Sequence, residues 1–123
     1  MQPNLSKDDR IEAGDVVLVN VVQVEPGRQD LALDVLRDTV RYVARSYETF
    51  CWSRLYRSLD GATVINQALW KSRDEFETLF SDEEFLKRYN GLREAGTWEY
   101  HLYELSDLIL PEQDTVPSGA LVD

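Results

Sequence analysis

The sequence predicts an α+β domain of the ferredoxin-like type, a βαββαβ sandwich in which helices cover one face of an antiparallel sheet. Its apolar segments follow the order strand, long helix, strand, strand, split helix, strand. The dipeptide Asp60-Gly61 lies between two strand-like runs, which is typical of a hairpin turn. At 123 residues the chain suits one domain with one core. We expect a mobile arm over residues 1–14, the domain over 15–110 and an extended or disordered tail over 111–123.

The first strand is predicted over Val16–Val24, a run rich in β-branched residues in which only Asn20 and Gln23 are polar. Pro26-Gly27 ends it, and apolar residues at helical spacing predict a helix from about Arg28 to Ser46. The first strand is apolar on both of its faces, and the helices can cover only one. A second copy of the chain would cover the other, so we expect a homodimer.

The remaining elements follow from turn and cap signals. A second strand, about Thr49 to Leu59, precedes the hairpin turn, and the third strand ends at Trp70. Serine followed three residues later by glutamate is the spacing of a capping box, which predicts two short helices in succession. The expected boundaries are a capping box at Ser72 and Glu75 with a helix from Arg73 to Phe80, a second box at Ser81 and Glu84, a helix end before Gly96, and a last strand from Thr97 to Leu105.

The third strand carries the best candidate site. Alternation places Val64, Asn66, Ala68 and Trp70 on one face, so an amide and an indole lie two pleats apart. The small side chain of Ala68 between them leaves room for a ligand. Asn20 interrupts an otherwise apolar strand, and a buried amide needs a partner. It either pairs with a neighbouring polar group or faces a ligand, while Trp70 taken alone could equally fill the core.

These residues resemble the antibiotic biosynthesis monooxygenase family over about Val16 to Leu105. The resemblance rests on Asn66-x-x-x-Trp70-x-Ser72, Val19-Asn20, Leu55-x-Arg57-Ser58-x-Asp60, the helical stretch Phe76 to Phe85, and the strand near Tyr100. It implies a dimeric α/β barrel with a ligand cavity between each sheet and its helices. The two asparagines with the tryptophan, and the tail Leu110-Pro111-Glu112, are most similar to the cofactor-free anthrone oxygenases of aromatic polyketide pathways.

Two departures from the family pattern bear on function. Tyr47-Glu48-Thr49 stands where relatives usually have Pro-Gly, which changes a turn. Haem-degrading relatives carry a histidine on the later helix, where this chain has Phe85-Leu86-Lys87-Arg88-Tyr89-Asn90. Without that histidine, axial ligation of haem iron lacks its ligand. The resemblance therefore implies Asn20, Asn66 and Trp70 as catalytic residues, with no cofactor and with O₂ as co-substrate.

Further residues are expected to bind substrate, each with a competing explanation. They are Tyr89, Tyr56, Trp52 and Arg88. Tyr89 lies on a helix stripe that would also suit the core, and Arg88 would also suit a solvated surface. Trp52 and Tyr56, like Trp98 and Tyr100, could line the cavity or the dimer face. The single histidine, His101, is expected at an interface or the surface because it has no companion ligand.

Composition excludes several classes of function. The formal net charge of −10 argues against nucleic acid, which is bound by clustered Lys and Arg. No apolar run is long enough to span a membrane, and the polar N-terminal residues do not form a signal peptide. Cys51 is the only cysteine and fits a reducing compartment, so we expect a cytoplasmic protein. There is no metal-ligand spacing and no phosphate, flavin or nicotinamide fingerprint.

The sequence and the resemblance together predict a monooxygenase that oxidises a flat, anthrone-type polyketide to a quinone with O₂ in antibiotic biosynthesis. Neutral amide and indole donors would stabilise the substrate's oxyanion. No side chain stands out as the base; solvent, another residue or the substrate's own phenol could take the proton. A non-redox polyketide cyclase or a small-molecule-binding protein of the same fold is the alternative, because one fold supports many functions.

Overall fold

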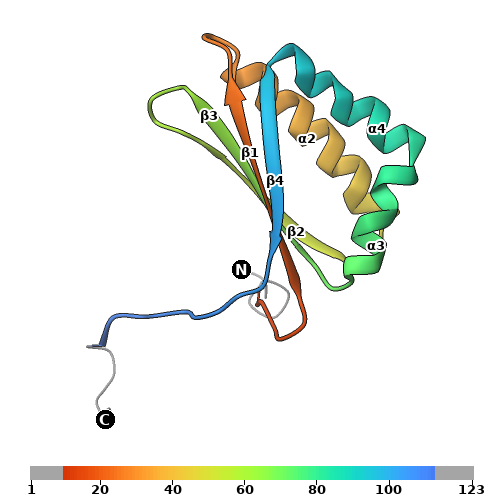
Figure 1. The fold of residues 1–123 in the computed structure, drawn as a ribbon, viewed down its shortest axis with the longest axis vertical. Helices are drawn as coiled ribbons and strands as arrows, with labels where there is room; N and C mark the ends of the chain where they lie inside the picture. Colours follow the sequence, from red (N-terminus) through yellow and green to blue (C-terminus); the bar gives the residue numbers. More distant parts are fainter. Residues whose placement is uncertain (1–9, 113–123) are drawn as a thin grey trace, which may run out of the picture.

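The computed structural model describes residues 10–112 and shows one antiparallel sheet with the strand order β2-β3-β1-β4 (Figure 1). The elements are β1 (Val16–Val24), α2 (Gln29–Ser46), β2 (Phe50–Arg57), β3 (Thr63–Trp70), α3 (Arg73–Glu77), the 3₁₀ turn η1 (Thr78–Ser81), α4 (Glu83–Tyr89), the 3₁₀ turn η2 (Asn90–Glu94) and β4 (Gly96–Tyr103). The predicted βαββαβ order is confirmed. The second and last strands are each about two residues shorter at their C-terminal ends than predicted.

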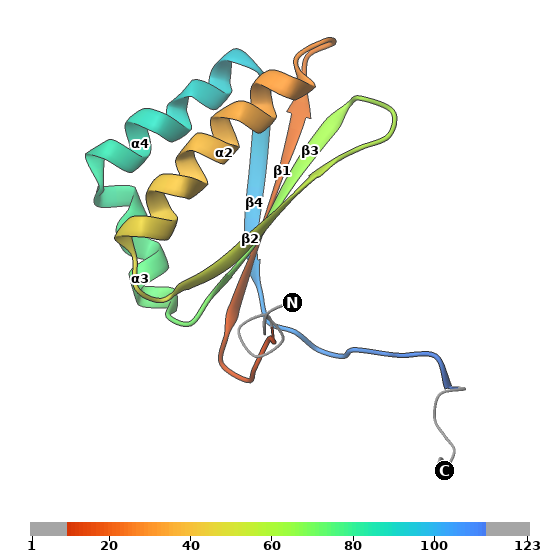
Figure 2. The same ribbon diagram turned by 180° about the vertical axis from the view of Figure 1, so that it is seen from behind.

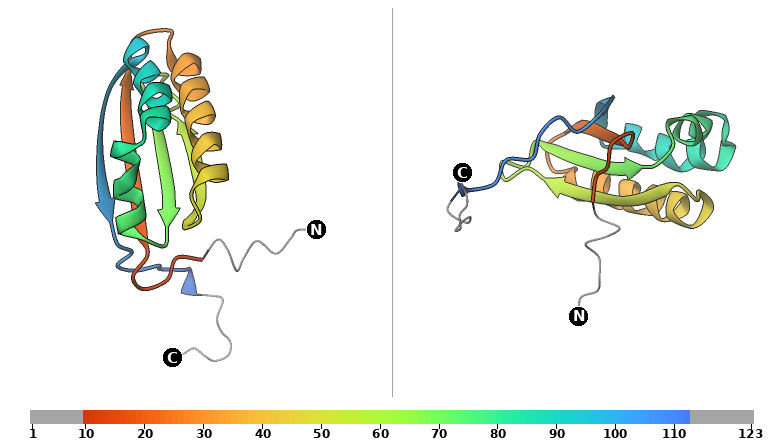
Figure 3. Two further views of the ribbon diagram at one scale, coloured as in Figure 1. Left: turned by 90° about the vertical axis from the view of Figure 1, so that its right-hand side faces the viewer. Right: turned by 90° about the horizontal axis from the view of Figure 1, so that it is seen from below.

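The helices form a single layer on one side of the sheet, and the outer face has no helix over it (Figures 2 and 3). Pairing of β1 with β3 sets Asn20 opposite Asn66, and pairing with β4 sets Asn20 opposite Tyr100. Side chains of even number on β1, β3 and β4 therefore face the helices. Val64, Asn66, Ala68 and Trp70 are all buried, as the alternation predicted. The outer face carries Val19 and Val21, which are partly exposed.

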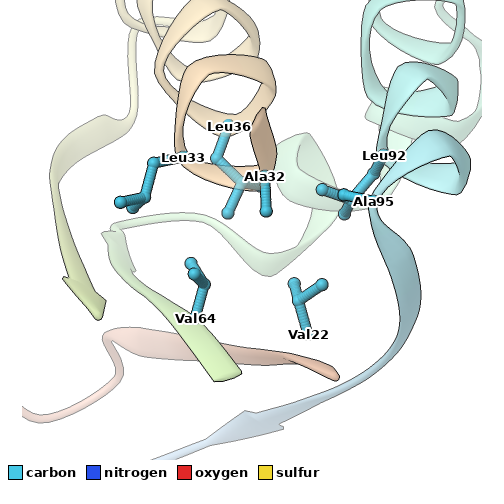
Figure 4. Close-up of a cluster of buried hydrophobic side chains, with 7 residues drawn as sticks. All are labelled: Val22, Ala32, Leu33, Leu36, Val64, Leu92 and Ala95. Carbon is cyan, nitrogen blue, oxygen red and sulfur yellow. The ribbon is translucent and has the colours of Figure 1, made fainter. Parts of the chain in front are cut away.

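One end of the layer is filled by a compact apolar cluster (Figure 4). Val22 and Val64 rise from the sheet toward α2, and the remaining members come from α2 and from the end of η2: Ala32, Leu33, Leu36, Leu92 and Ala95. A second cluster around Trp70 fills the other end with larger aromatic side chains. The space between sheet and helices is therefore closed at the first end and bounded by aromatic rings at the second.

The helix starts differ from the predicted capping boxes. Ser72 does cap α3, accepting from the Glu75 amide at 3.0 Å. The Glu75 carboxylate, however, accepts from the amide of Thr49 at 2.8 Å and from its hydroxyl. It thus fastens the turn before β2 instead of completing a capping box. The second box is wrong, because Asp82 and not Ser81 caps α4. A carboxylate at that position accepts from two amides, at 3.0 and 3.1 Å.

Gly96 opens β4 at a point where two backbones approach closely. A Cβ atom placed on Gly96 would lie 1.9 Å from the carbonyl oxygen of Gln23 on β1. Gly96 lies just past the helical segment, as predicted, but close packing against β1 is what excludes a side chain. After β4 the chain leaves the body (Figure 1), and Leu108, Ile109 and Leu110 are largely exposed there.

Most of the predicted arm and nearly all of the predicted tail lie outside the described residues. Within residues 10–112, no helix is both long and apolar enough to cross a membrane.

Candidate functional site

A cavity lies between the helix-facing side of the sheet and the helix layer. Every element except η2 contributes to its wall, and most of the contributed side chains are apolar or aromatic. They are Leu18, Asn20, Leu36, Thr39, Val40, Val43, Phe50, Asn66, Ala68, Trp70, Phe76, Leu79, Phe80, Phe85, Tyr89 and Tyr100. The cavity has a volume of about 50 Å³. Sites for drug-sized ligands are usually about 300–1,000 Å³, so a polycyclic ligand requires this wall to open.

Three polar side chains of the cavity wall lie in one row across the sheet. The strand register places Asn66 of β3, Asn20 of β1 and Tyr100 of β4 side by side. Cross-strand neighbours of this kind have Cβ atoms about 4.5–5.5 Å apart. Asn20 is 2% exposed and Asn66 is 7% exposed. The two amides that lie 46 residues apart in sequence thus meet at one point of the cavity wall.

Asn20 is bonded to the helix layer. Its Nδ2 donates to the hydroxyl oxygen of Tyr89 on α4 at 2.8 Å. Burial raises the pKa of Tyr89 above its ordinary value, and the hydrogen bond from Asn20 opposes part of that rise. Tyr89 is therefore a neutral phenol at physiological pH. The Oδ1 atom of Asn20 is buried and has no hydrogen-bond partner among residues 10–112.

Asn66 and Trp70 flank Ala68 on the same face of β3. The Ser53 hydroxyl of β2 donates to the Oδ1 atom of Asn66, which leaves the amide N–H groups of Asn66 for another acceptor. Trp70 is 1% exposed and meets three rings edge to face: Tyr47 at 5.8 Å, Phe50 at 5.6 Å and Phe76 at 5.6 Å. These contacts hold the indole in one orientation.

The described wall of the cavity contains no Asp, Glu, Lys, Arg, His or Cys side chain. Tyrosine is the one ordinarily titratable residue type in it, and Tyr89 is held in the neutral form. The hydroxyl of Thr39, also in the wall, donates to a backbone carbonyl of its own helix at 2.8 Å. The arrangement therefore offers neutral hydrogen-bond donors inside an apolar, aromatic enclosure.

A stacked aromatic pair divides this cavity from the outside. Phe80 of η1 and Tyr100 of β4 lie with centroids 5.8 Å apart and planes 9° from parallel. Both are partly exposed, at 40% and 37%. On their far side is an open groove of about 560 Å³, to which Phe80, Tyr89 and Tyr100 also contribute. The pair thus lies between the cavity and this open groove.

Comparison with known proteins identifies the family. The model of the antibiotic biosynthesis monooxygenase family matches residues 15–90, more than half of the chain. This chain belongs to the antibiotic biosynthesis monooxygenase family. The resemblance noted from the sequence is confirmed, and the protein is an oxidoreductase of this family. A search of curated proteins found no match.

Solved structures include close relatives in fold. SnoaB of Streptomyces nogalater, a cofactor-independent oxygenase, is 29% identical, with a TM-score of 0.69, and the match covers 81% of this chain and 100% of SnoaB. The ActVA-Orf6 monooxygenase of Streptomyces coelicolor, solved with the ligand nanaomycin D, is 22% identical with a TM-score of 0.68. That match covers 79% of this chain and 92% of the relative, and it supports the fold.

The structure of this monooxygenase brings Asn20, Asn66, Trp70 and Tyr89 to one cavity. It does not bring Tyr56, Trp52 or Arg88 there. Tyr56 and Trp52 lie on the outer sheet face, where Tyr56 donates to Gln67 at 2.9 Å. Register explains this, because β2 residues 52, 54 and 56 pair with β3 residues that face away from the helices. Neither side chain contributes to the cavity wall.

Arg88 lies on the helix layer, outside the cavity of the monooxygenase. Its guanidinium pairs with Asp38 of α2 at 3.0 Å and with Glu84 of α4 at 2.6 Å. It therefore ties α4 to α2. His101 lies on the outer sheet face beside Glu99, at 2.7 Å, which agrees with the surface or interface position expected for it.

Sequence reasoning missed Ser53, Phe80 and Asp82 as contributors to the site. Ser53 orients Asn66, and Phe80 with Tyr100 closes the wall. Asp82 anchors α4, the helix that carries Tyr89, by accepting from the hydroxyls of Tyr42 and Tyr47. These two hydrogen bonds lower the pKa of Asp82 to about 2, and the bond from Tyr47 has the larger effect. The cap position of Asp82 was readable from the sequence, whereas the other contacts depend on strand register and helix packing.

Proposed function

We propose that this monooxygenase oxidises a flat aromatic polyketide of the anthrone type to a quinone with O₂, without a metal or organic cofactor. The observation that carries the proposal is an apolar, aromatic cavity whose described wall carries neutral hydrogen-bonding side chains and no charged one: Asn20, Asn66, Trp70 and Tyr89. Support also comes from SnoaB, which is a cofactor-independent oxygenase, and from the polyketide-like ligand nanaomycin D in ActVA-Orf6.

In the proposed reaction the substrate supplies the electrons. Loss of a proton from the CH₂ carbon of an anthrone gives a delocalised anion, which transfers an electron to O₂. The resulting radicals combine to form a carbon–oxygen bond, and the hydroperoxide then loses water to give the quinone. The balance for the parent compound is C₁₄H₁₀O + O₂ → C₁₄H₈O₂ + H₂O. One oxygen atom enters the product and the other leaves as water.

Hydrogen-bond donors can accelerate such a reaction by stabilising the anion. In an enclosed site, donors aimed at developing negative charge are worth more than they are in water. We assign this role to the amide N–H of Asn66 and to the indole N–H of Trp70, which is also an aromatic wall. Asn20, expected from the sequence to be a third donor, uses one N–H on Tyr89.

Within residues 10–112, the cavity wall contains no strong base for the proton. The described lining residues include no carboxylate or imidazole, and the raised pKa of Tyr89 disfavours a tyrosinate. We therefore assign the proton to solvent or to a phenolate of the substrate itself. A phenolic substrate with a low pKa should then react faster than one whose phenol is methylated.

Substrate must displace part of the wall, because a cavity of about 50 Å³ does not hold three fused rings. We propose that it enters between Phe80 and Tyr100, which stack on each other and are both partly exposed. Phe80 lies in the four-residue turn η1, which is held by fewer hydrogen bonds than a longer helix. A flat aromatic ligand can take the place of one ring in this stack.

We propose that the functional unit is a homodimer in which the outer sheet face packs against a second copy. Val19 and Val21 are partly exposed on this face, and the segment after β4 leaves the body with Leu108, Ile109 and Leu110 exposed. The single cysteine fits the reducing cytoplasm. Sedimentation at micromolar concentration should give a dimer, which Val19→Arg should dissociate. A folded parent monomer would refute the proposed packing.

The proposed function is tested by oxygen uptake. Protein freed of metal by a chelator, and free of flavin absorbance, is mixed with anthrone in an oxygen electrode. We expect uptake of one O₂ per anthrone, at a rate proportional to protein. Binding without oxygen uptake, or ring closure of a poly-β-ketone without oxygen uptake, would instead favour the binding protein or the cyclase.

A further inference from the structure

The polar atoms of Asn20 and Tyr89 are only partly used within the protein. Asn20 Nδ2 donates to the Tyr89 oxygen at 2.8 Å, so the tyrosine acts as an acceptor in this bond. Its own O–H proton is then available to another acceptor. Asn20 Oδ1 is buried, lies on a residue of the cavity wall and has no partner in the described chain. Besides the second N–H of Asn20, the pair thus offers one acceptor, Asn20 Oδ1, and one donor on the opposite wall, the Tyr89 O–H.

An unpaired buried carbonyl oxygen is costly, because it has given up its hydrogen bonds to water without replacement. A ligand that supplies an O–H group to it recovers that cost on binding. The Asn20 Oδ1 acceptor and the Tyr89 O–H donor are connected through one amide group and one hydrogen bond. They therefore lie within reach of two oxygens on the same ring system. Neither is charged, because burial holds Tyr89 as a phenol.

We propose that Asn20 and Tyr89 recognise a hydroxyl and a carbonyl that lie close together on one flat aromatic ligand. Asn20 Oδ1 accepts from the ligand hydroxyl, and the Tyr89 O–H donates to the ligand carbonyl. This specificity rests on the proposed function for the polycyclic scaffold and adds its substituents: a phenol or enol beside a carbonyl. It also changes the role of Asn20 from donor to acceptor.

The positions of Asn20 and Tyr89 in the fold favour ligand recognition over a role in packing alone. Asn20 lies between Asn66 and Tyr100 in the strand register, on the floor of the cavity, while Tyr89 reaches it from α4 on the opposite wall. Tyr89 also stacks on Phe85 at 5.2 Å and contacts Trp98 at 5.2 Å, which hold its ring in place. The hydroxyl is thus presented from a fixed ring.

The test is equilibrium binding under nitrogen, so that no oxidation takes place. Two probe pairs of matched shape are used: 1-naphthol against 1-fluoronaphthalene for the hydroxyl, and 1-acetylnaphthalene against 1-isopropenylnaphthalene for the carbonyl. The parent should prefer the polar member of each pair by about two- to tenfold, the value of one neutral hydrogen bond. Asn20→Leu should abolish the hydroxyl preference. Tyr89→Phe should abolish the carbonyl preference and keep the hydroxyl preference.

Tyr42→Phe is the matched control, since it deletes a tyrosine hydroxyl that bonds Asp82 at 2.7 Å outside the cavity. It should keep both preferences. The proposal is overturned if Asn20→Leu keeps the hydroxyl preference, or if Tyr89→Phe removes that preference instead of the carbonyl one. The second result would mean that the Asn20 amide has the opposite orientation, with Nδ2 donating to the ligand. If Asn20→Leu does not fold, the Tyr89→Phe result decides alone.

Binding and oxidation can fail separately. Both preferences with no oxygen uptake would refute the proposed oxygenase activity and leave this recognition intact. Oxygen uptake by a parent protein that shows neither preference would refute this recognition and leave the proposed oxygenase activity intact.

Discussion

Replacing Trp70 by phenylalanine should slow turnover far more than it destabilises the protein. The substitution deletes the indole N–H and keeps an aromatic ring against Tyr47, Phe50 and Phe76. If the N–H donates to charge that develops in the reaction, its loss should lower kcat about 10²–10³-fold, or roughly 2.7–4 kcal/mol. The effect should fall on kcat more than on KM, because the donor acts mainly in the transition state.

The stability cost follows from the packing of the same ring. Each edge-to-face contact is worth about 0.5–1.5 kcal/mol beyond its buried area, and the smaller ring weakens such contacts without removing them all. We therefore expect a loss of about 1–2 kcal/mol in the free energy of unfolding, against a total of about 5–15 kcal/mol for a domain. Trp70→Phe should remain folded at 25 °C. Trp70→Ala is unsuitable, because such truncations cost about 3–5 kcal/mol.

The assay pairs oxygen consumption on anthrone with urea unfolding of the same samples. Trp52→Phe makes the identical change on the outer sheet face and should leave kcat and KM unchanged. This control also tests the expectation from the sequence that Trp52 binds substrate. If Trp70→Phe stays folded and turns over at the parent rate, Trp70 only fills space and the proposed donor role is refuted.

Other substitutions test the wall, the helix anchor and the sheet. Phe80→Ala should speed association of anthrone in stopped flow, since it removes half of the stack that closes the cavity; an unchanged rate would place the entrance elsewhere. Asp82→Asn should lower the urea midpoint at pH 7. Because the pKa of Asp82 is lowered to about 2, the difference from the parent should shrink as pH falls from about 4 toward 2; a constant difference would refute this. Gly96→Ala should cost about 3 kcal/mol or more by urea unfolding, because its Cβ would clash with Gln23. Gly61→Ala, which meets no atom within 4 Å but has φ of +79°, should cost about 1–2 kcal/mol; equal losses would contradict the clash.

The fold could be predicted because its signals are local. A β-branched run, a helical apolar stripe and an Asp-Gly turn each specify an element without reference to the rest of the chain. The face of β3 that carries Asn66 and Trp70 followed from alternation alone and is buried as predicted. The second cap was misassigned because Ser81 and Asp82 are adjacent cap formers, and a carboxylate that also accepts from two tyrosines is held more firmly.

The site was predictable only where it depends on alternation. The bond between Asn20 and Tyr89, 69 residues apart, depends on how α4 packs on the sheet. The stack of Phe80 on Tyr100 depends on how a 3₁₀ turn packs against β4, from which α4 and η2 separate it in the chain. The sequence did not assign Trp52 and Tyr56 to one face of the sheet. A bulge between Phe50 and Trp52 interrupts the regular alternation of side chains along β2. Such long-range contacts have no signal in a single sequence.

Oxygenation itself is tested most directly by turnover of anthrone under ¹⁸O₂ in ordinary water. Chelator-treated protein should give a quinone that carries one ¹⁸O atom, with one O₂ consumed per quinone and one molecule of water formed. Trp70→Phe should give the same labelled product more slowly. A quinone without ¹⁸O from the parent, or a rate no higher than that of anthrone in buffer, would contradict the assignment of oxygen transfer to this cavity.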